Sequence, residues 1–257
     1  MGLQPGTIYR FEAASMKLSV QLYSLREAAK SNFPKVIEEV ARQGYDGVEF
    51  AGLHGHAASE LRSILDRVGI VASSGHVAVL DPTKWDEVRS EADTLGYKHL
   101  VGGFGESDFK SEEAIRSAAA TVNRAVEHFV PLGYTVGIHN HWWEYDAPNK
   151  GALLLELCPQ AHPQFDTYWV TCGGADAAAY IHRYRGRVKL IHIKDGPLDR
   201  HQAMTAVGKG KVEIKSVVGA ALETGVEWGI VELDRCDTDM LEAIGESARY
   251  LKPLLTR

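Results

Sequence analysis

Four segments of the sequence contain clusters of carboxylate and imidazole side chains, the groups that most often bind metal ions or transfer protons. The segments are HNHWWE at 139–144, FDT at 165–167, HIKD at 192–195 and ELD at 232–234. The candidate ligands within them are Glu144, Asp166, His192 and Glu232. Three carboxylates and one imidazole form a hard donor set, which suits Mn²⁺, Mg²⁺ or Co²⁺. Such a set is unlike a zinc site built from cysteine thiolates.

Each of these residues, taken alone, has a more ordinary explanation. A single Asp or Glu at the end of a strand usually caps a helix or pairs with a nearby lysine. Their joint occurrence changes the interpretation, because several carboxylates buried near one another repel unless a cation or a proton offsets their charge. We therefore interpret the four residues together as a metal site.

The segments recur within a regular pattern of short apolar runs rich in β-branched residues, each followed by a longer stretch with helical spacing. The predicted strands are 17–24, 46–50, 70–76, 98–103, 134–141, 163–167, 188–195 and 228–234. Five predicted helices run into a glycine that can end a helix in the left-handed conformation. These glycines are Gly44, Gly69, Gly96, Gly133 and Gly186.

The repeated order of strand, helix and strand implies a parallel sheet with right-handed crossovers. Eight such units in 257 residues fit a single closed (β/α)₈ TIM barrel. An open doubly wound sheet would call for a G-x-G-x-x-G turn after an early strand, and none is present there. We expect the barrel to span residues 16–257, after an N-terminal extension over residues 1–15, with the polar segments meeting at the carboxyl ends of the strands.

The composition narrows the possible function classes. Apolar residues make up 45% of the chain and charged residues 24%, with a formal net charge of −6. No apolar run approaches the ~20 residues of a membrane span, and the N-terminus lacks a secretory pattern, so we expect a cytoplasmic protein. The acidic balance argues against nucleic-acid binding driven by phosphate neutralisation. Cys158, Cys172 and Cys236 suit neither a disulfide framework nor a C-x-x-C zinc site.

The same segments resemble the xylose isomerase-like TIM-barrel superfamily. This is the sugar phosphate isomerase/epimerase group, which also includes inosose dehydratases, ketose 3-epimerases and endonuclease IV. The resemblance covers about residues 17–255. Its pieces are SVQLYSLR, YDGVEF, SSGH, IHNHWWEY, FDTYWV, LIHIKDG with VGKGKVEI after it, and IVELD. The most specific part is HNHxxE together with HIKD and the later G-x-G.

The resemblance implies a metal-dependent isomerase/epimerase or lyase. Its metal ligands would be Glu144, Asp166, His192 and Glu232. Mn²⁺ is the first ion to expect, with Mg²⁺, Co²⁺ or Zn²⁺ as alternatives. In the epimerase branch the first and last ligands also exchange protons with the substrate, which makes Glu144 and Glu232 candidate acid/base groups. This chain departs from that pattern by placing HNH ahead of the first glutamate, which promotes His141 as the general base and favours dehydratase or 3-keto-glycoside-eliminating members over ketose epimerases.

The chemistry that we infer is proton abstraction next to a carbonyl group of a keto-sugar, a 3-keto-glycoside or an inosose-type polyol. A divalent ion would polarise the carbonyl and stabilise the enediolate, and a base with a pKa near neutrality, best supplied by histidine, would move the proton. Return of the proton to the other face of the same carbon gives epimerisation, and return to the neighbouring carbon gives isomerisation. Loss of a β-substituent gives dehydration or glycoside cleavage. The ligand set does not choose among these outcomes.

Further polar and aromatic residues are candidate substrate contacts. They are Gln21, Glu49, His76, Trp142, Trp169 and Lys194. Tryptophan faces suit the C–H surfaces of sugars, although buried tryptophan more often belongs to a core. A structural hydrogen bond inside the barrel is an equal alternative for Glu49. Lys194 follows His192 by two residues and shares its strand face. It would contact a substrate oxygen or pair with Asp166 or Asp195.

Two other function classes are alternatives to this enzyme. An endonuclease IV-like phosphodiester hydrolase would need several metal ions and a basic groove, whereas a non-catalytic sugar-binding barrel would keep the pocket without turnover. Gly208 and Gly210 could form a flexible or anion-holding loop, but the sequence lacks a strong phosphate-binding fingerprint. We expect a small-molecule carbohydrate as the partner, with no nucleic acid and no membrane, and leave a homo-oligomer open.

Overall fold

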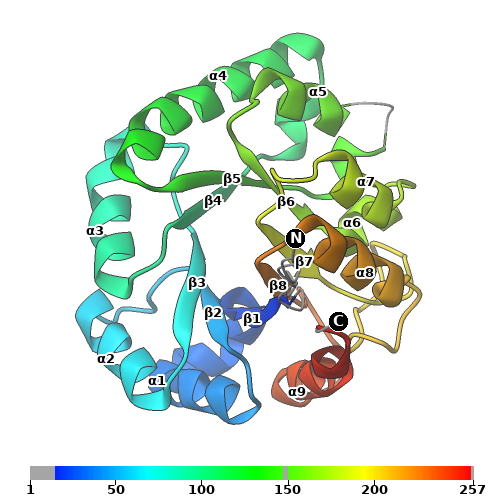
Figure 1. Cartoon of the computed structure of the whole chain (residues 1–257). Coiled ribbons are helices and arrows are strands. Elements are labelled where there is room, and N and C mark those ends of the chain that lie inside the picture. The colour runs from blue at the N-terminus through cyan, green and yellow to red at the C-terminus, as the bar shows by residue number, and fades with distance from the viewer. Residues whose placement is uncertain (1–14, 147–149, 256–257) are drawn as a thin grey trace, which may run out of the picture.

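The computed structural model describes residues 15–146 and 150–255. In this part of the chain, eight parallel strands close into a barrel in the order β1 to β8, and β8 pairs back onto β1. The helices surround the barrel and follow one another along the chain, from blue to red in Figure 1. The prediction of a single (β/α)₈ TIM barrel is confirmed. The expected extension over residues 1–15 lies outside the described residues, apart from Ser15.

The observed elements follow the predicted order. The strands are β1 (Lys17–Gln21), β2 (Gly47–Phe50), β3 (Val71–His76), β4 (His99–Gly103), β5 (Thr135–His139), β6 (His162–Asp166), β7 (Leu190–Ile193) and β8 (Trp228–Val231). The α-helices are α1 (Arg26–Arg42), α2 (Ala58–Val68), α3 (Trp85–Leu95), α4 (Glu112–Phe129), α5 (Lys150–Leu157), α6 (Thr167–Cys172), α7 (Ala177–Arg183), α8 (Ile214–Thr224) and α9 (Met240–Leu251). The 3₁₀ turns are η1 (Leu22–Leu25), η2 (Pro82–Lys84), η3 (Glu106–Phe109), η4 (Val130–Leu132), η5 (Trp142–Glu144) and η6 (Lys252–Leu254).

Glycines end the helices where the sequence predicts. α2 and α3 stop at Gly69 and Gly96, whose φ angles of 76° and 87° lie in the left-handed region that glycine adopts without a steric penalty. The other three predicted glycines, Gly44, Gly133 and Gly186, also have positive φ. The chain can therefore turn from each helix into the next strand within a few residues.

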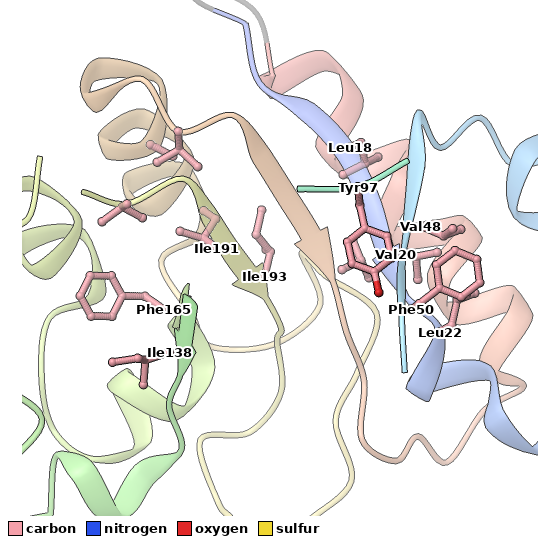
Figure 2. Packing of buried hydrophobic residues seen from close by; sticks show 14 of the residues in the cluster. Leu18, Val20, Leu22, Val48, Phe50, Tyr97, Ile138, Phe165, Ile191 and Ile193 are labelled. Carbon is pink, nitrogen blue, oxygen red and sulfur yellow. The ribbon is translucent and has the colours of Figure 1, made fainter. Parts of the chain in front are cut away.

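The outer face of the strands packs against the helices through apolar side chains. On β1 and β2 these are Leu18, Val20, Val48 and Phe50, all fully buried. Figure 2 shows them beside the strands, together with Ile191 and Ile193 of β7. Since side chains alternate along a strand, the residues between them point into the barrel. The apolar contacts with the helices thus determine which residues face the barrel interior.

A separate apolar cluster fills part of the barrel interior. It consists of Val101, Leu190, Trp228 and Ile230, and two of these are the first residues of β7 and β8. Gly47 leaves space for this layer, because a Cβ there would lie 3.0 Å from the indole ring of Trp228. The carboxyl end of the barrel is left to polar side chains. No helix in the described residues combines the length and hydropathy that crossing a membrane requires.

Candidate active site

A pocket of about 520 Å³ opens at the carboxyl end of the barrel. Aromatic side chains form its walls, namely Tyr23, Phe104, Trp142, Trp143 and Trp169. Its polar lining consists of His76, His139, His141, Lys194, Glu232 and Asp234. This is where (β/α)₈ enzymes place their active sites, because the loops that follow the strands meet there.

Four side chains that can bind a metal ion converge at the carboxyl end of the barrel, and two of them, His139 and Glu232, line the pocket. The four are His139, Asp166, His192 and Glu232. Each offers one ligand atom, and the four atoms lie within 4.8 Å of one another. The first three residues belong to β5, β6 and β7, and Glu232 directly follows β8. Two imidazole nitrogens and two carboxylate oxygens at this spacing fit a divalent transition-metal ion. Three of the four expected ligands therefore come together, with His139 as the fourth.

Burial governs the charge of these ligands. Asp166 and His192 have no exposed surface, and only 6% of Glu232 is exposed. Burial raises the pKa of Asp166 to about 6, although the Lys194 ammonium opposes this shift. Burial also holds the pKa of His139 well below its usual value, so the ring is neutral and retains a lone pair. A cation bound among these groups would offset the cost of burying the carboxylates.

His192 lies between two carboxylates. Its Nδ1 is 2.7 Å from Glu232 Oε2, and its Nε2 is 2.6 Å from Glu49 Oε1. Burial disfavours a charged ring, but the two carboxylates outweigh it and raise the pKa of His192 to about 10. The imidazolium thus supplies part of the positive charge that the site needs. Metal binding by this ring would require the loss of one of its protons.

Lys194 supplies further positive charge. Its Nζ is 2.8 Å from Asp166 Oδ2, 2.8 Å from Glu232 Oε2 and 3.0 Å from Asp234 Oδ1. Burial disfavours the ammonium, but these carboxylates hold the pKa of Lys194 well above its usual value. The expected ion pair with Asp166 is present, and Lys194 also lines the pocket, where it can meet a substrate.

Glu144 lies outside this group of donors. It belongs to the η5 turn, and its Oε2 accepts a hydrogen bond from the backbone N–H of His141 at 3.0 Å. The turn folds the carboxyl group back onto its own segment, beside a hollow lined by Ile138, Leu154 and Phe165. Burial there raises the pKa of Glu144 to about 8. The expected roles of Glu144 as ligand and as acid/base do not fit this placement.

His141, the expected general base, lies at the pocket. Its ring lines the pocket and stacks on Trp143, with a centroid distance of 4.1 Å and an interplanar angle of 15°. Burial lowers the pKa of His141 to about 4, so the ring is neutral at pH 7 and can accept a proton. This value is lower than the near-neutral pKa that the sequence argument expects. Glu232, the second candidate base, is paired with Lys194 and His192, which hold its pKa well below the usual range despite its burial.

The expected substrate contacts divide into two groups. The first lines the pocket and consists of His76, Trp142, Trp169 and Lys194. Gln21 and Glu49 form the second group and are fully buried inside the barrel, where Gln21 Nε2 donates to Glu49 Oε1 at 2.6 Å. Direct contact with a substrate does not fit these two residues. The structural hydrogen bond considered for Glu49 is the arrangement found.

Asp195 organises the loop that follows β7. Its carboxylate accepts hydrogen bonds of 2.8 to 3.1 Å from the backbone N–H groups of Gly196, Gly208, Gly210 and Val212. A Cβ on Gly210 would collide with this carboxylate. The two glycines of VGKGKVE do hold an anion, but the anion is the side chain of Asp195. The same contacts explain why Asp195 does not pair with Lys194.

Gln164 and His139, which have no role in the sequence-based expectations, connect the parts of the site. Gln164 Oε1 lies 2.8 Å from His76 Nε2 and 3.2 Å from His139 Nδ1, and Gln164 Nε2 donates to Glu49 at 2.6 Å. Strand alternation is the signal that could have found Gln164, because it lies two residues before Asp166 and shares its face. His139 is the last residue of β5, a position typical of active-site residues in this architecture.

The sequence matches the family model described as xylose isomerase-like TIM barrel over residues 37–254. The chain belongs to the xylose isomerase-like TIM barrel family. In sequence, the chain is 26% identical to an inosose dehydratase from Geobacillus kaustophilus over 211 residues. That alignment covers 72% of this chain and 68% of the dehydratase.

Solved structures show the same barrel. A sugar phosphate isomerase/epimerase from Parabacteroides distasonis superposes with a TM-score of 0.80 at 19% identity, covering 93% of this chain and 99% of that chain. A D-allulose 3-epimerase from Methylomonas sp. gives a TM-score of 0.72 at 17% identity, covering 94% of this chain and 99% of that chain. At such low identity, this likeness is one of fold.

Proposed function

We propose that this chain is a divalent-metal-dependent enzyme that removes a proton next to the carbonyl group of a keto-sugar, a 3-keto-glycoside or an inosose-type polyol. The observation that carries the proposal is the convergence of two histidines and two carboxylates beside a pocket with aromatic walls, which His139 and Glu232 also line. Isomerisation, epimerisation and dehydration share this first step. The similarity to an inosose dehydratase makes dehydration of an inosose the first reaction to test.

The donor set favours a transition-metal ion. With His139 in place of Glu144, the site has two nitrogen and two oxygen donors, a softer set than three oxygens and one nitrogen. Mn²⁺ remains the first ion to test, and Co²⁺ and Zn²⁺ suit the imidazoles better than Mg²⁺ does. When bound, the ion would act as a Lewis acid that polarises a substrate carbonyl.

The protein side chains then have separate tasks. His141 is the proposed base, because its neutral ring lines the pocket. The carboxylate of Glu232, in contrast, forms ion pairs with His192 and Lys194. Lys194 lines the pocket, and its ammonium group would stabilise the substrate oxygen on which negative charge develops. Trp142 and Trp169, with ring centroids 4.9 Å apart, would hold the C–H face of the sugar and exclude water.

The test is proton exchange in deuterated water. The purified protein, loaded with Mn²⁺, is incubated with a panel of inososes and keto-sugars, and exchange of the C–H next to the carbonyl is followed by NMR. We expect exchange or turnover of at least one compound, its loss on adding a chelator, and its loss in Asp166→Asn. Sugar binding without exchange would support the non-catalytic barrel, and cleavage of abasic DNA without sugar turnover would support the endonuclease. Either outcome would overturn the proposal.

A further inference from the structure

The Glu49 carboxylate is enclosed at the centre of the barrel. Its side chain has no exposed surface, and four donors surround it at 2.5 to 2.6 Å. The donors are Gln21 Nε2, Ser74 Oγ, Gln164 Nε2 and His192 Nε2, from β1, β3, β6 and β7. With both oxygens engaged, Glu49 is not available to a substrate. Its contacts instead connect several strands to one member of the metal-binding group.

An irregularity in the sheet presents Glu49 to these donors. The register between β2 and β3 shifts between Val48 and Glu49, so that Val48 pairs with Ala72 whereas Glu49 pairs with Ser74. Such bulges re-aim a side chain and recur next to active sites. Here the shift sets Glu49 opposite Ser74, whose hydroxyl donates to the carboxylate. The backbone itself is therefore shaped to hold this anion in place.

Glu49 determines which nitrogen of His192 can bind a metal ion. A carboxylate only accepts hydrogen bonds, so the His192 Nε2 that contacts it at 2.6 Å carries a hydrogen. The other nitrogen, Nδ1, lies 2.7 Å from Oε2 of Glu232, which is itself a member of the donor group. Nδ1 is therefore the ring nitrogen that faces another member of the donor group, whereas Nε2 faces Glu49, which lies outside it.

Gln164 applies the same constraint to His139. Because its Nε2 donates to Glu49, its Oε1 faces His139 Nδ1 at 3.2 Å. An amide oxygen only accepts, so His139 carries its hydrogen on Nδ1. Its Nε2 is then free and lies 3.9 Å from Asp166 Oδ2. One buried anion thus fixes one histidine directly and the other through an amide.

We propose that Glu49 and Gln164 are positioning residues, which select Nδ1 of His192 and Nε2 of His139 as the metal-binding nitrogens. This inference rests on the metal site of the proposed function. Groups that hold the second nitrogen of a ligating histidine fix its ring and tautomer, and their loss typically weakens metal binding by about 10- to 100-fold. Glu49, expected from the sequence to contact substrate, would act on the metal instead.

The first test is Co²⁺ binding, measured by competition with a chromogenic chelator and by the visible absorption of the bound ion. Glu49→Gln and Gln164→Leu are each expected to weaken Co²⁺ binding by about 10- to 100-fold and to change the spectrum. Glu144→Gln is the matched control, because it makes the same substitution at a buried carboxyl group outside the donor set. The control should bind Co²⁺ as the wild type does. Unchanged affinity in both test variants overturns the inference.

A second measurement uses the wild-type protein and therefore does not depend on whether a Glu49 variant folds. Histidine labelled with nitrogen-15 reports, in the wild type loaded with Zn²⁺, which ring nitrogen binds the metal. We expect Zn²⁺ on Nδ1 of His192 and on Nε2 of His139. The signals are assigned by their loss in His192→Asn and His139→Asn. Zn²⁺ on Nε2 of His192 would overturn the inference. A wild type that binds neither ion refutes the metal site and the inference together. Normal binding by all variants refutes the inference alone.

Discussion

The ammonium group of Lys194 and a bound metal ion would share the same two carboxylates. Asp166 and Glu232 each lie 2.8 Å from Nζ, and both belong to the metal-binding group. Two cations at this spacing repel, so Lys194 should limit the metal affinity of the site. We expect Lys194→Met to bind Mn²⁺ about 10-fold more tightly, equivalent to ~1.4 kcal/mol, while turnover falls because the pocket loses its cation. Titration calorimetry measures the first effect and steady-state kinetics the second.

The matched control for this prediction is Lys189→Met. Lys189 pairs with Glu227. The two residues directly precede β7 and β8 and therefore lie at the amino end of the barrel, away from the donor group. Loss of Lys189 should thus leave the Mn²⁺ affinity unchanged. Weaker Mn²⁺ binding in Lys194→Met would show that the ammonium organises the ligands more than it repels the ion.

Asp166 and His141 allow metal binding to be separated from proton transfer. Asp166→Ala removes a ligand, so metal affinity and turnover should fall together. His141→Ala leaves the four donors intact, and we expect it to retain the metal but to lose turnover by about 10²-fold or more. Metal content and kcat are measured on the same preparations. Normal turnover in His141→Ala would mean that another group is the base.

Among the four expected metal ligands, sequence patterns predict the position correctly only where the backbone is regular. Asp166 and His192 lie on strands, and Glu232 follows its strand by one residue, so alternation and strand position bring all three into one donor group. Glu144 lies five residues beyond the end of β5, inside the η5 turn. Its direction depends on the hydrogen bond to the backbone of His141, which spacing alone does not reveal.

The same distinction applies to whole elements. All eight predicted strands are present, and seven of them contain a β-branched residue, whereas β6 contains none. Their ends differ, since β7 and β8 stop at Ile193 and Val231 and the following residues leave the ladder for the loops of the site. α1 begins at Arg26, and the extended backbone of Asn32, two residues before Pro34, interrupts its helical conformation.

The loop after β7 depends on glycine at one position. Gly210 donates its N–H to Asp195 Oδ2, and a Cβ would collide with the same carboxylate. We expect Gly210→Ala to lower the free energy of unfolding by about 1–3 kcal/mol, the usual cost of inserting an atom into a packed site. Urea unfolding of the variant and the wild type measures the difference.

Gly105→Ala provides the control for this loop. A Cβ at Gly105 would meet its nearest neighbours at 3.7 Å, and its φ of −82° is accessible to alanine. This variant should unfold within about 0.5 kcal/mol of the wild type. If both alanine variants are equally stable, the loop can rearrange around Asp195 and the carboxylate does not fix it.

Over the molecule as a whole, stability and chemistry come from different layers. The apolar layer between strands and helices is continuous around the barrel, whereas the carboxyl end of the interior contains buried acids, histidines and a lysine. Burying charged groups costs free energy even when they are paired. The apolar layer must therefore stabilise a site that by itself opposes folding, and this opposition should be visible in the pH dependence of unfolding.

Glu144 provides the clearest case, because burial raises its pKa to about 8 from a usual value of 4.5. Between these two pH values the folded protein keeps a proton that the unfolded chain releases, so raising the pH lowers the free energy of unfolding, by at most about 1.4 kcal/mol per pH unit. Glu144→Gln carries no titrating proton and can still accept the hydrogen bond from His141. We expect its stability relative to the wild type to increase from pH 5 to pH 8 in urea unfolding with chelator present. The control is Glu106→Gln, a substitution at an exposed residue. Its free energy of unfolding should change with pH as that of the wild type does. If the free energies of unfolding of the wild type and of Glu144→Gln change with pH in parallel, Glu144 is ionised in the folded protein.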